Sequence, residues 1–169
     1  MAIRTVLHAE DETLRKTSRP VEALNKRMLT LLDDLAETMY AQEGVGLAAP
    51  QVGVLRRAIA VDVGDENGLI QLINPEIVHM EGERENPEGC LSVPGRRGYV
   101  KRPEKAVVRG ITRSGKAVEI EAEGFLAVAF CHEIDHLDGV LYIDKMTREL
   151  TEEEIAALTA QQDENEDDA

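Results

Sequence analysis

The segment 132–136 reads HEIDH and holds the residues best suited to chemistry. On an α-helix, His132 and His136 lie four residues apart and therefore on one face, where a single metal ion can bind both rings. Glu133 projects to the side, where its carboxylate can hold and deprotonate a water molecule on the metal. The pattern therefore predicts a metal-dependent hydrolase. The pattern alone leaves open an ordinary amphipathic helix with solvent-exposed His, Glu and Asp side chains.

A catalytic metal of this kind has three protein ligands and one position for water. Downstream, the acidic run 152–154 lies at a distance compatible with metallopeptidases that use a glutamate ligand. Upstream, Cys90 in the segment EGCLS would complete a site of two histidines and a thiolate, and the metal would keep the thiol deprotonated. A third alternative is a closed structural zinc site in a binding module, which needs a fourth protein ligand.

Length and charge limit the other functions. A chain of 169 residues with 43% apolar residues suits one domain with a substantial core. The formal charge of −14 argues against direct nucleic-acid recognition, which needs clustered cations. Residues 149–169 hold nine acidic side chains and no Lys or Arg. We expect a catalytic domain over 1–148, and a short C-terminal helix with an acidic tail of no fixed structure over 149–169.

The distribution of apolar residues predicts a cytoplasmic protein. The N-terminal residues have no long apolar core of the kind that a secretory signal requires, and no run of about twenty apolar residues could span a membrane. Cys90 and Cys131 are too few for a disulfide framework and are expected to be thiols, with Cys131 packed in the core.

Periodicity and turn residues predict an α+β fold. Apolar residues at helical spacing indicate an N-terminal helix over 21–42, and the glycine-rich stretch 44–53 indicates a loop. Strand composition predicts one hairpin from 58–63 and 69–73 with a tight turn at Asn67-Gly68, a continuation at 77–80, and a second hairpin from 105–111 and 116–122.

The histidine motif belongs to a predicted helix over 125–138, which Gly139 ends. Its first turns are almost wholly apolar, so we expect it to be buried against the strands with its histidines in a protected pocket. A short helix over 155–158 precedes the tail. The expected architecture is antiparallel strands and hairpins packed around a central HExxH helix, with helices near both ends.

Three segments together resemble the signature motifs of the peptide deformylase family. They are 44–51 (GVGLAAPQ), 88–92 (EGCLS) and 132–136 (HEIDH), in the family's order and at similar separations. The resemblance extends from near the N-terminus to about residue 147. It implies removal of the formyl group from the N-terminal N-formylmethionine of newly synthesised polypeptides, with release of formate. The alternative remains an HExxH metallopeptidase with a downstream glutamate ligand.

The resemblance also assigns roles residue by residue. It implies that Cys90, His132 and His136 bind one divalent ion, physiologically Fe²⁺, with Ni²⁺, Co²⁺ or Zn²⁺ able to substitute. Glu133 would take a proton from the metal-bound water and deliver it to the departing amine. The negative charge on the formyl oxygen would be stabilised by donors already in place. By the match, these are the Gln51 side-chain amide and the Leu91 backbone N–H.

The residues themselves suggest where a substrate would lie. The small residues of segment 44–51 allow an extended peptide to approach Val45 and Gly46 through its backbone. Val128 and Ala129 precede His132 by four and three residues and therefore lie on the same face of the predicted helix. We expect an apolar pocket for the methionine side chain, formed by Val45, Val128, Ala129 and the His132 ring.

One basic cluster remains, and a solvent-exposed loop is its expected setting. Within it, Arg97 is the candidate for contact with substrate carbonyls or with the ribosome, since it follows Cys90 closely. The acidic C-terminus would be repelled by ribosomal RNA, so we expect at most a transient contact with the ribosome by another route. The cluster consists of Arg96, Arg97, Lys101, Arg102 and Lys105.

Overall fold

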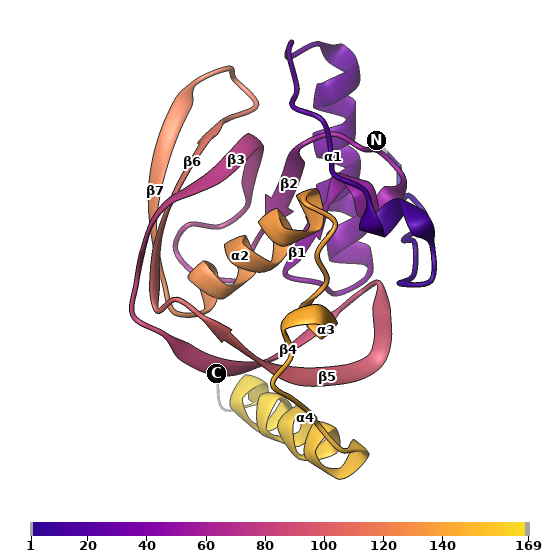
Figure 1. Cartoon of the computed structure of the whole chain (residues 1–169), viewed down its shortest axis with the longest axis vertical. Helices are drawn as coiled ribbons and strands as arrows, with labels where there is room; N and C mark the ends of the chain where they lie inside the picture. The colour runs from indigo at the N-terminus through magenta and orange to yellow at the C-terminus, as the bar shows by residue number, and fades with distance from the viewer. Residues whose placement is uncertain (1, 168–169) are drawn as a thin grey trace.

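The computed structural model describes residues 2–167 and has the predicted α+β architecture of antiparallel strands around a central helix (Figure 1). In chain order, the elements are η1 (Glu12–Arg15), α1 (Lys26–Ala41), β1 (Gly46–Ala48), η2 (Ala49–Val52), β2 (Ala58–Val61), β3 (Ile70–Glu81), β4 (Arg84–Cys90), β5 (Val93–Arg102), β6 (Lys105–Ile111), β7 (Ala117–Glu123), α2 (Phe125–Leu137), α3 (Tyr142–Lys145), β8 (Arg148–Glu149) and α4 (Glu152–Asp167).

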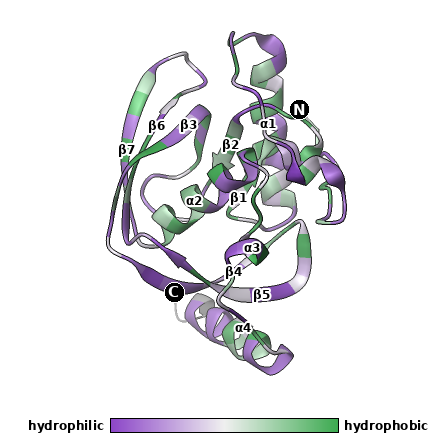
Figure 2. Cartoon of the chain, viewed as in Figure 1, coloured by the Kyte–Doolittle hydropathy of each residue, from purple (hydrophilic) through white to green (hydrophobic). Residues whose placement is uncertain are grey.

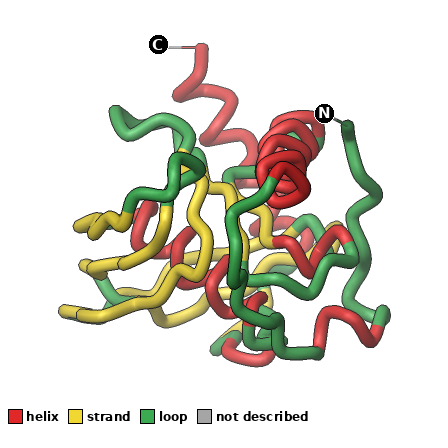
Figure 3. Tube along the Cα trace, turned by 90° about the horizontal axis from the view of Figure 1, so that it is seen from above, coloured by secondary structure: helices red, strands yellow, loops and turns green. Residues whose placement is uncertain are grey.

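The strands form two antiparallel sheets. The larger has the order β1-β2-β3-β6-β7, and the smaller has the order β4-β5-β8. The long strands β3, β6 and β7 lie on one side of α2 in Figure 1, and β4 and β5 run below it. Seen from above, the strands gather on one side of the molecule, and the N-terminal residues descend along the other (Figure 3).

The sequence of β2 explains why helices cover both faces of the larger sheet. All four of its residues are buried. Ile59 and Val61 belong to the core cluster that contains α2, whereas Ala58 and Ala60 belong to the cluster that contains α1. Alternate residues of a strand point to opposite faces, so this short strand packs against α2 with large side chains and against α1 with small ones.

Helix α2 is central because its first turns carry hardly any polar side chains. It packs against β1, β2 and β7, and residues such as Phe130 and Leu137 are fully buried. The helix ends at Leu137, and Gly139 follows with a φ of 74°. A Cβ atom at Gly139 would lie 2.6 Å from the backbone carbon of Arg15, so glycine is required by both conformation and space.

Most predicted elements are confirmed with shifted ends. Helix α1 begins at Lys26, where the Asn25 side chain accepts a hydrogen bond from the Met28 N–H. The hairpin β6–β7 matches the prediction, and α2 ends one residue before the predicted end. The predicted continuation at 77–80 belongs to the long strand β3.

Three features differ from the prediction. The first hairpin pairs Val61 with Ile70, so residues 62–69 form a longer loop and Asn67-Gly68 is not a two-residue turn. The glycine-rich stretch holds β1 and η2. Strands β4 and β5 were not predicted, because their polar residues, Pro and Gly lack strand composition.

The C-terminal helix is longer than the predicted segment 155–158. Thr151 and Glu154 form a capping box, in which the Thr151 hydroxyl accepts from the Glu154 N–H and the Glu154 carboxylate accepts from the Thr151 N–H, and α4 continues to Asp167. In Figure 2, hydrophilic residues occupy much of α4, which lies outside β5 and away from α2. The last two residues of the predicted tail lie outside the described residues.

A bilayer-spanning helix is not found in the described part of the chain, where each helix is too short or too polar for that purpose.

Candidate metal centre

Cys90, His132 and His136 converge beside α2. Cys90 ends β4 and pairs with Val93 across the tight connection to β5, while both histidines project from the last two turns of α2. The three ligand atoms lie within 4.8 Å of one another. Within residues 2–167, this is the one group of three or more His, Cys, Asp or Glu side chains placed to hold an ion.

The distances fit a single small cation. The two Nε2 atoms of His132 and His136 are 3.2 Å apart, and Cys90 Sγ lies 3.4 Å from His136 Nε2. Ligand atoms around one tetrahedral divalent ion are about 3.3–3.6 Å apart. A soft thiolate with two imidazoles suits iron, cobalt, nickel and zinc alike, so the donor set favours a transition metal without choosing the ion.

The surroundings of the ligands favour a positive charge. Burial opposes a charge on His132, but neighbouring Glu133, Cys90 and Glu88 outweigh it and hold the pKa of the imidazole well above its usual value. Burial and the proximity of His132 hold the pKa of His136 well below its usual value. The acidic groups around His132 therefore favour a positive charge at this position.

Glu88 fixes the orientation of the first histidine. Its Oε1 atom lies 2.8 Å from His132 Nδ1, so Nδ1 carries the proton and Nε2 faces the other ligands. Burial acts to raise the pKa of the Glu88 carboxyl, but hydrogen bonds with His132 and Arg102 outweigh it and lower the pKa. From the sequence alone, Glu88 is equally consistent with orienting a ligand and with forming a local salt bridge. The structure shows both kinds of contact, with His132 and with Arg102.

Glu133 has a buried carboxyl group beside the two histidines. Its side chain is buried, and its Oε1 atom has no hydrogen-bond partner among the described residues. Burial raises the pKa of its carboxyl to about 7, against the opposing effect of His132. A carboxyl group that titrates near neutrality can both accept and return a proton, which is what hydrolysis of an amide requires.

The close approach of β1 makes room for this carboxylate. A Cβ atom at Gly46 would lie 2.8 Å from Glu133 Cδ and 2.9 Å from Glu133 Cγ, closer than carbon atoms pack. Glycine at this position therefore lets Glu133 lie against the edge strand. Its neighbour Val45 is 39% exposed, so the edge remains accessible.

Gln51 joins the site from η2. Its side-chain oxygen accepts a hydrogen bond from the Ala48 N–H, which fixes the amide. Its Nε2 atom lies 3.0 Å from Ser92 Oγ and 3.5 Å from Cys90 Sγ, so the donor end faces the Cys90 sulfur. Leu91 is half-buried between Cys90 and Ser92, and its side chain contacts the position where Gly44 would carry a Cβ.

The predicted pocket residues are only partly brought together. Val128 and Ala129 are both buried on α2. Val128 lines a cleft of about 530 Å³ together with Phe125 and Asn86. Charged residues also line this cleft, namely Arg84, Glu104, Lys105 and Glu123. Neither Ala129 nor Val45 is among the residues that line it. A methionine pocket formed by all of the predicted residues remains a prediction.

The expectation of a solvent-exposed basic loop is wrong, because all five residues of the cluster lie on strands, with Lys105 at the start of β6. The first four residues of the cluster lie on strand β5, and the Arg102 side chain is 3% exposed and paired with Glu88. Arg96 pairs with Glu149. Arg97 has a half-buried side chain that packs against Gly89, the residue before Cys90. Arg97 thus stays a candidate for substrate contact.

Sequence reasoning missed two neighbours of the ligands. Tyr142 is buried with its ring stacked at 6.1 Å from that of His132, and its hydroxyl donates to the Arg96 carbonyl. Arg102 holds Glu88. No local pattern identifies either partner; only the position of Tyr142, six residues past the motif, could have suggested proximity.

The glutamate alternatives for the third ligand are not supported. Glu154 forms an ion pair with Arg148 at the start of α4, and the run 152–154 does not join the two histidines in the described structure. A closed structural site is not supported either, since the group within residues 2–167 has three members and no fourth.

Comparisons with known proteins agree with this geometry. The family model described as polypeptide deformylase matches residues 3–152. A peptide deformylase of Acetivibrio thermocellus is 56% identical over 155 residues, which cover 92% of this chain and 90% of the relative. The crystal structure of a peptide deformylase from Legionella pneumophila has a TM-score of 0.83 and 48% identity, covering 86% of this chain and 87% of that one.

A further similar structure is a class I type b peptide deformylase from Acinetobacter baumannii with Met-Ala-Ser bound. It has a TM-score of 0.81 and 32% identity, and covers 86% of this chain and 99% of that one. The match of the family model across most of the chain, together with these identities, shows that this chain belongs to the polypeptide deformylase family.

Proposed function

We propose that this protein removes the formyl group from the N-terminal N-formylmethionine of newly synthesised polypeptides and releases formate. The observation that carries the proposal is the convergence of Cys90, His132 and His136 beside Glu133, whose buried Oε1 has no partner among the described residues. Membership of the polypeptide deformylase family supports the same reaction. The relative with Met-Ala-Ser bound suggests the class of peptide product.

In this proposal, Cys90, His132 and His136 hold one divalent ion. When bound, such an ion acts as a Lewis acid that lowers the pKa of water and polarises a carbonyl group. Glu133 takes a proton from the attacking water and later gives it to the leaving nitrogen. The new C–O bond forms at the formyl carbon, the C–N bond breaks, and formate and a free N-terminal amine leave.

The remaining residues position the substrate. The Gln51 amide and the Leu91 backbone N–H donate to the formyl oxygen as negative charge develops there. The peptide backbone lies in extended form beside Val45 and Gly46, which explains tolerance for different sequences after the methionine. Val128 and Ala129 contribute to the methionine pocket, and Arg97 faces the following carbonyls.

The proposal includes Fe²⁺ as the native ion, within the set of ions that a thiolate and two imidazoles accept. It places the reaction in the cytoplasm at or near the ribosome, where nascent chains arise. Because phosphate repels an acidic surface, contact with ribosomal RNA would use a face other than α4. Residues 1–148 form the catalytic domain in this account, and α4 is appended to it.

The experiment is a formate-release assay with formyl-Met-Ala-Ser and protein purified without oxygen, with metal content measured on the same sample. Oxygen is excluded because a ferrous centre with a cysteine ligand is open to oxidation. We expect formate in step with the bound metal and no cleavage of internal peptide bonds. Cleavage between residues of the peptide without formate release would refute the proposal.

A further inference from the structure

A continuous set of ion pairs leads from the candidate metal centre to the surface. Arg102 on β5 is 3% exposed and binds both carboxylate oxygens of Glu88, with Nε–Oε2 at 2.7 Å and Nη2–Oε1 at 3.0 Å. Its third nitrogen, Nη1, lies 2.6 Å from Asp135 Oδ2. Lys145 at the end of α3 lies 3.1 Å from the same Asp135 oxygen.

These contacts bear on the orientation of His132, the candidate metal ligand that Glu88 binds. Glu88 Oε1 receives hydrogen bonds from both His132 and Arg102, so any rotation of the Glu88 carboxylate disturbs both. Arg102 is planar and is held on two sides, by Glu88 along one edge and by Asp135 at the remaining nitrogen. Without Asp135, the guanidinium would be held by Glu88 alone.

Asp135 is also well placed to tie the two parts of the site together. It lies on α2 between the two histidines, but its side chain reaches Arg102 on β5. Glu88 and Cys90 belong to β4, which pairs with β5. The same arginine therefore links the helix that carries the imidazoles to the strands that carry the thiol.

We propose that Asp135 is a positioning residue of the metal centre, which holds Arg102 against Glu88 and thereby keeps His132 Nε2 directed at Cys90 and His136. The inference rests on the proposed metal site. A merely structural brace between α2 and β5 would stabilise the fold but would not alter the ligand geometry of the folded, loaded protein. The two roles are separated by the spectrum and the affinity of the bound ion.

The test uses Co²⁺ added to the metal-free full-length protein, because its visible absorption reports ligand geometry. Changes to residues that orient metal ligands typically weaken metal binding about 10–100-fold. We expect Asp135→Ala to weaken Co²⁺ binding toward the upper end of that range and to alter the absorption bands. Asp135→Asn, which keeps the volume, is expected near the lower end. All variants are compared at a temperature where circular dichroism shows them folded.

Asp138→Ala is the matched control, since Asp138 pairs with Arg57 at the end of the same helix and is 53% exposed. We expect it to match wild type in affinity and spectrum. In a Glu88→Ala background, the change at Asp135 should add less than about twofold, because residues that act through one another are not additive.

The outcomes are separable. If wild type binds Co²⁺ and both Asp135 variants match it in affinity and spectrum, the inference fails while the proposed metal site stands. An equal loss in Asp138→Ala, or the same fold-change with and without Glu88, also overturns it. A wild-type protein that binds no Co²⁺ overturns the metal site and this inference together.

Discussion

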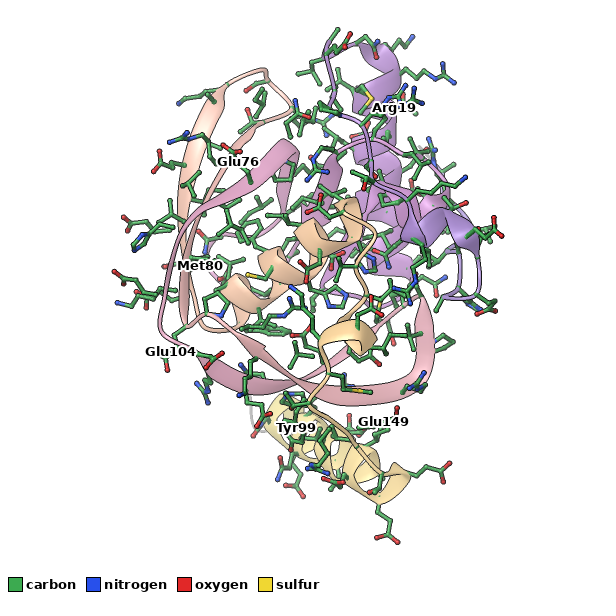
Figure 4. All side chains as sticks on the ribbon, in the orientation of Figure 1. Arg19, Glu76, Met80, Tyr99, Glu104 and Glu149 are labelled. Carbon is green, nitrogen blue, oxygen red and sulfur yellow. The ribbon has the colours of Figure 1, made fainter. Side chains whose placement is uncertain are left out.

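Helices α2 and α4 carry similar acidic residues in opposite environments. On α2, Glu133 is buried, and the half-buried Asp135 forms an ion pair with the buried Arg102. On α4, the acidic side chains at 152, 153, 163 and 164 are exposed, and Glu154 is half-buried and forms an ion pair with Arg148. Figure 4 shows Tyr99 and Glu149 where the chain passes from the smaller sheet to α4, outside the core. The same residue type therefore behaves differently in the two helices, because burial raises the pKa of Glu133 whereas hydrogen bonds lower the pKa of Glu154.

The largest effect is expected from the buried base. Glu133→Gln should lower the rate of formate release about 10²–10⁴-fold, because an amide cannot accept the proton from water. Metal content should stay at the wild-type level, since Glu133 is not a ligand in this account. Glu153→Gln, at an exposed position of α4, is the control and should keep the full rate. A Glu133→Gln enzyme with a near-normal rate would contradict the assigned role.

The same two helices should contribute differently to the free energy of unfolding of the protein. Phe130→Ala removes a fully buried ring from α2 and should lower the free energy of unfolding by about 3–5 kcal/mol. Leu158→Ala on α4 removes a half-buried side chain and should cost about 0.5 kcal/mol or less. Urea unfolding measures both. Equal losses would mean that α4 belongs to the core as much as α2 does.

A glycine outside both helices sharpens the comparison, because it controls the space around Glu133. In Gly46→Ala, the added methyl would displace the carboxylate, and a misplacement of about 1 Å can cost about 100-fold in rate. We expect such a fall in kcat with unchanged metal content. A variant that keeps its kcat would show that the reaction tolerates movement of the Glu133 carboxylate, or that β1 moves instead of Glu133.

The smallest effect concerns the exposed carboxylate of α4. Hydrogen bonds from Arg148 and Thr151 lower the pKa of Glu154 from 4.5 to about 2. Because the folded-state pKa is depressed, its contribution to helix stability is present above pH 4.5 and disappears as the pH falls through about 2. An NMR titration should find the midpoint near 2 in wild type and nearer 4.5 in Arg148→Ala. A midpoint unmoved by that substitution would exclude the ion pair as the cause.

Local sequence patterns predict α1, α2 and the hairpin β6–β7. Helix α1 follows from its apolar spacing and α2 from an apolar run that Gly139 ends, and the hairpin β6–β7 follows from strand composition on both sides of Ser114-Gly115. The sequence predicts too short a helix for α4, because the polar residues that follow Leu158 do not form an apolar face.

Long-range pairing was not predictable in the same way. Strands β4 and β5 pair with each other, and α3 packs against both of them. Because these contacts stabilise the two strands, their composition alone does not identify them as strands. Arg102 seemed a surface cation because its partners Glu88 and Asp135 are 14 and 33 residues distant. Three motifs are sufficient to nominate the candidate site residues, whereas the long-range contacts that hold those residues have no local signal in the sequence.

The most direct test of the central claim is reconstitution of metal-free protein with Fe²⁺ in the absence of oxygen, with formate release measured at each addition. The account predicts a rate that rises in proportion to Fe²⁺ and levels off at one equivalent per chain, and no rise at one equivalent in Cys90→Ala. Full activity in the presence of a strong chelator, or wild-type reconstitution of Cys90→Ala, would contradict it.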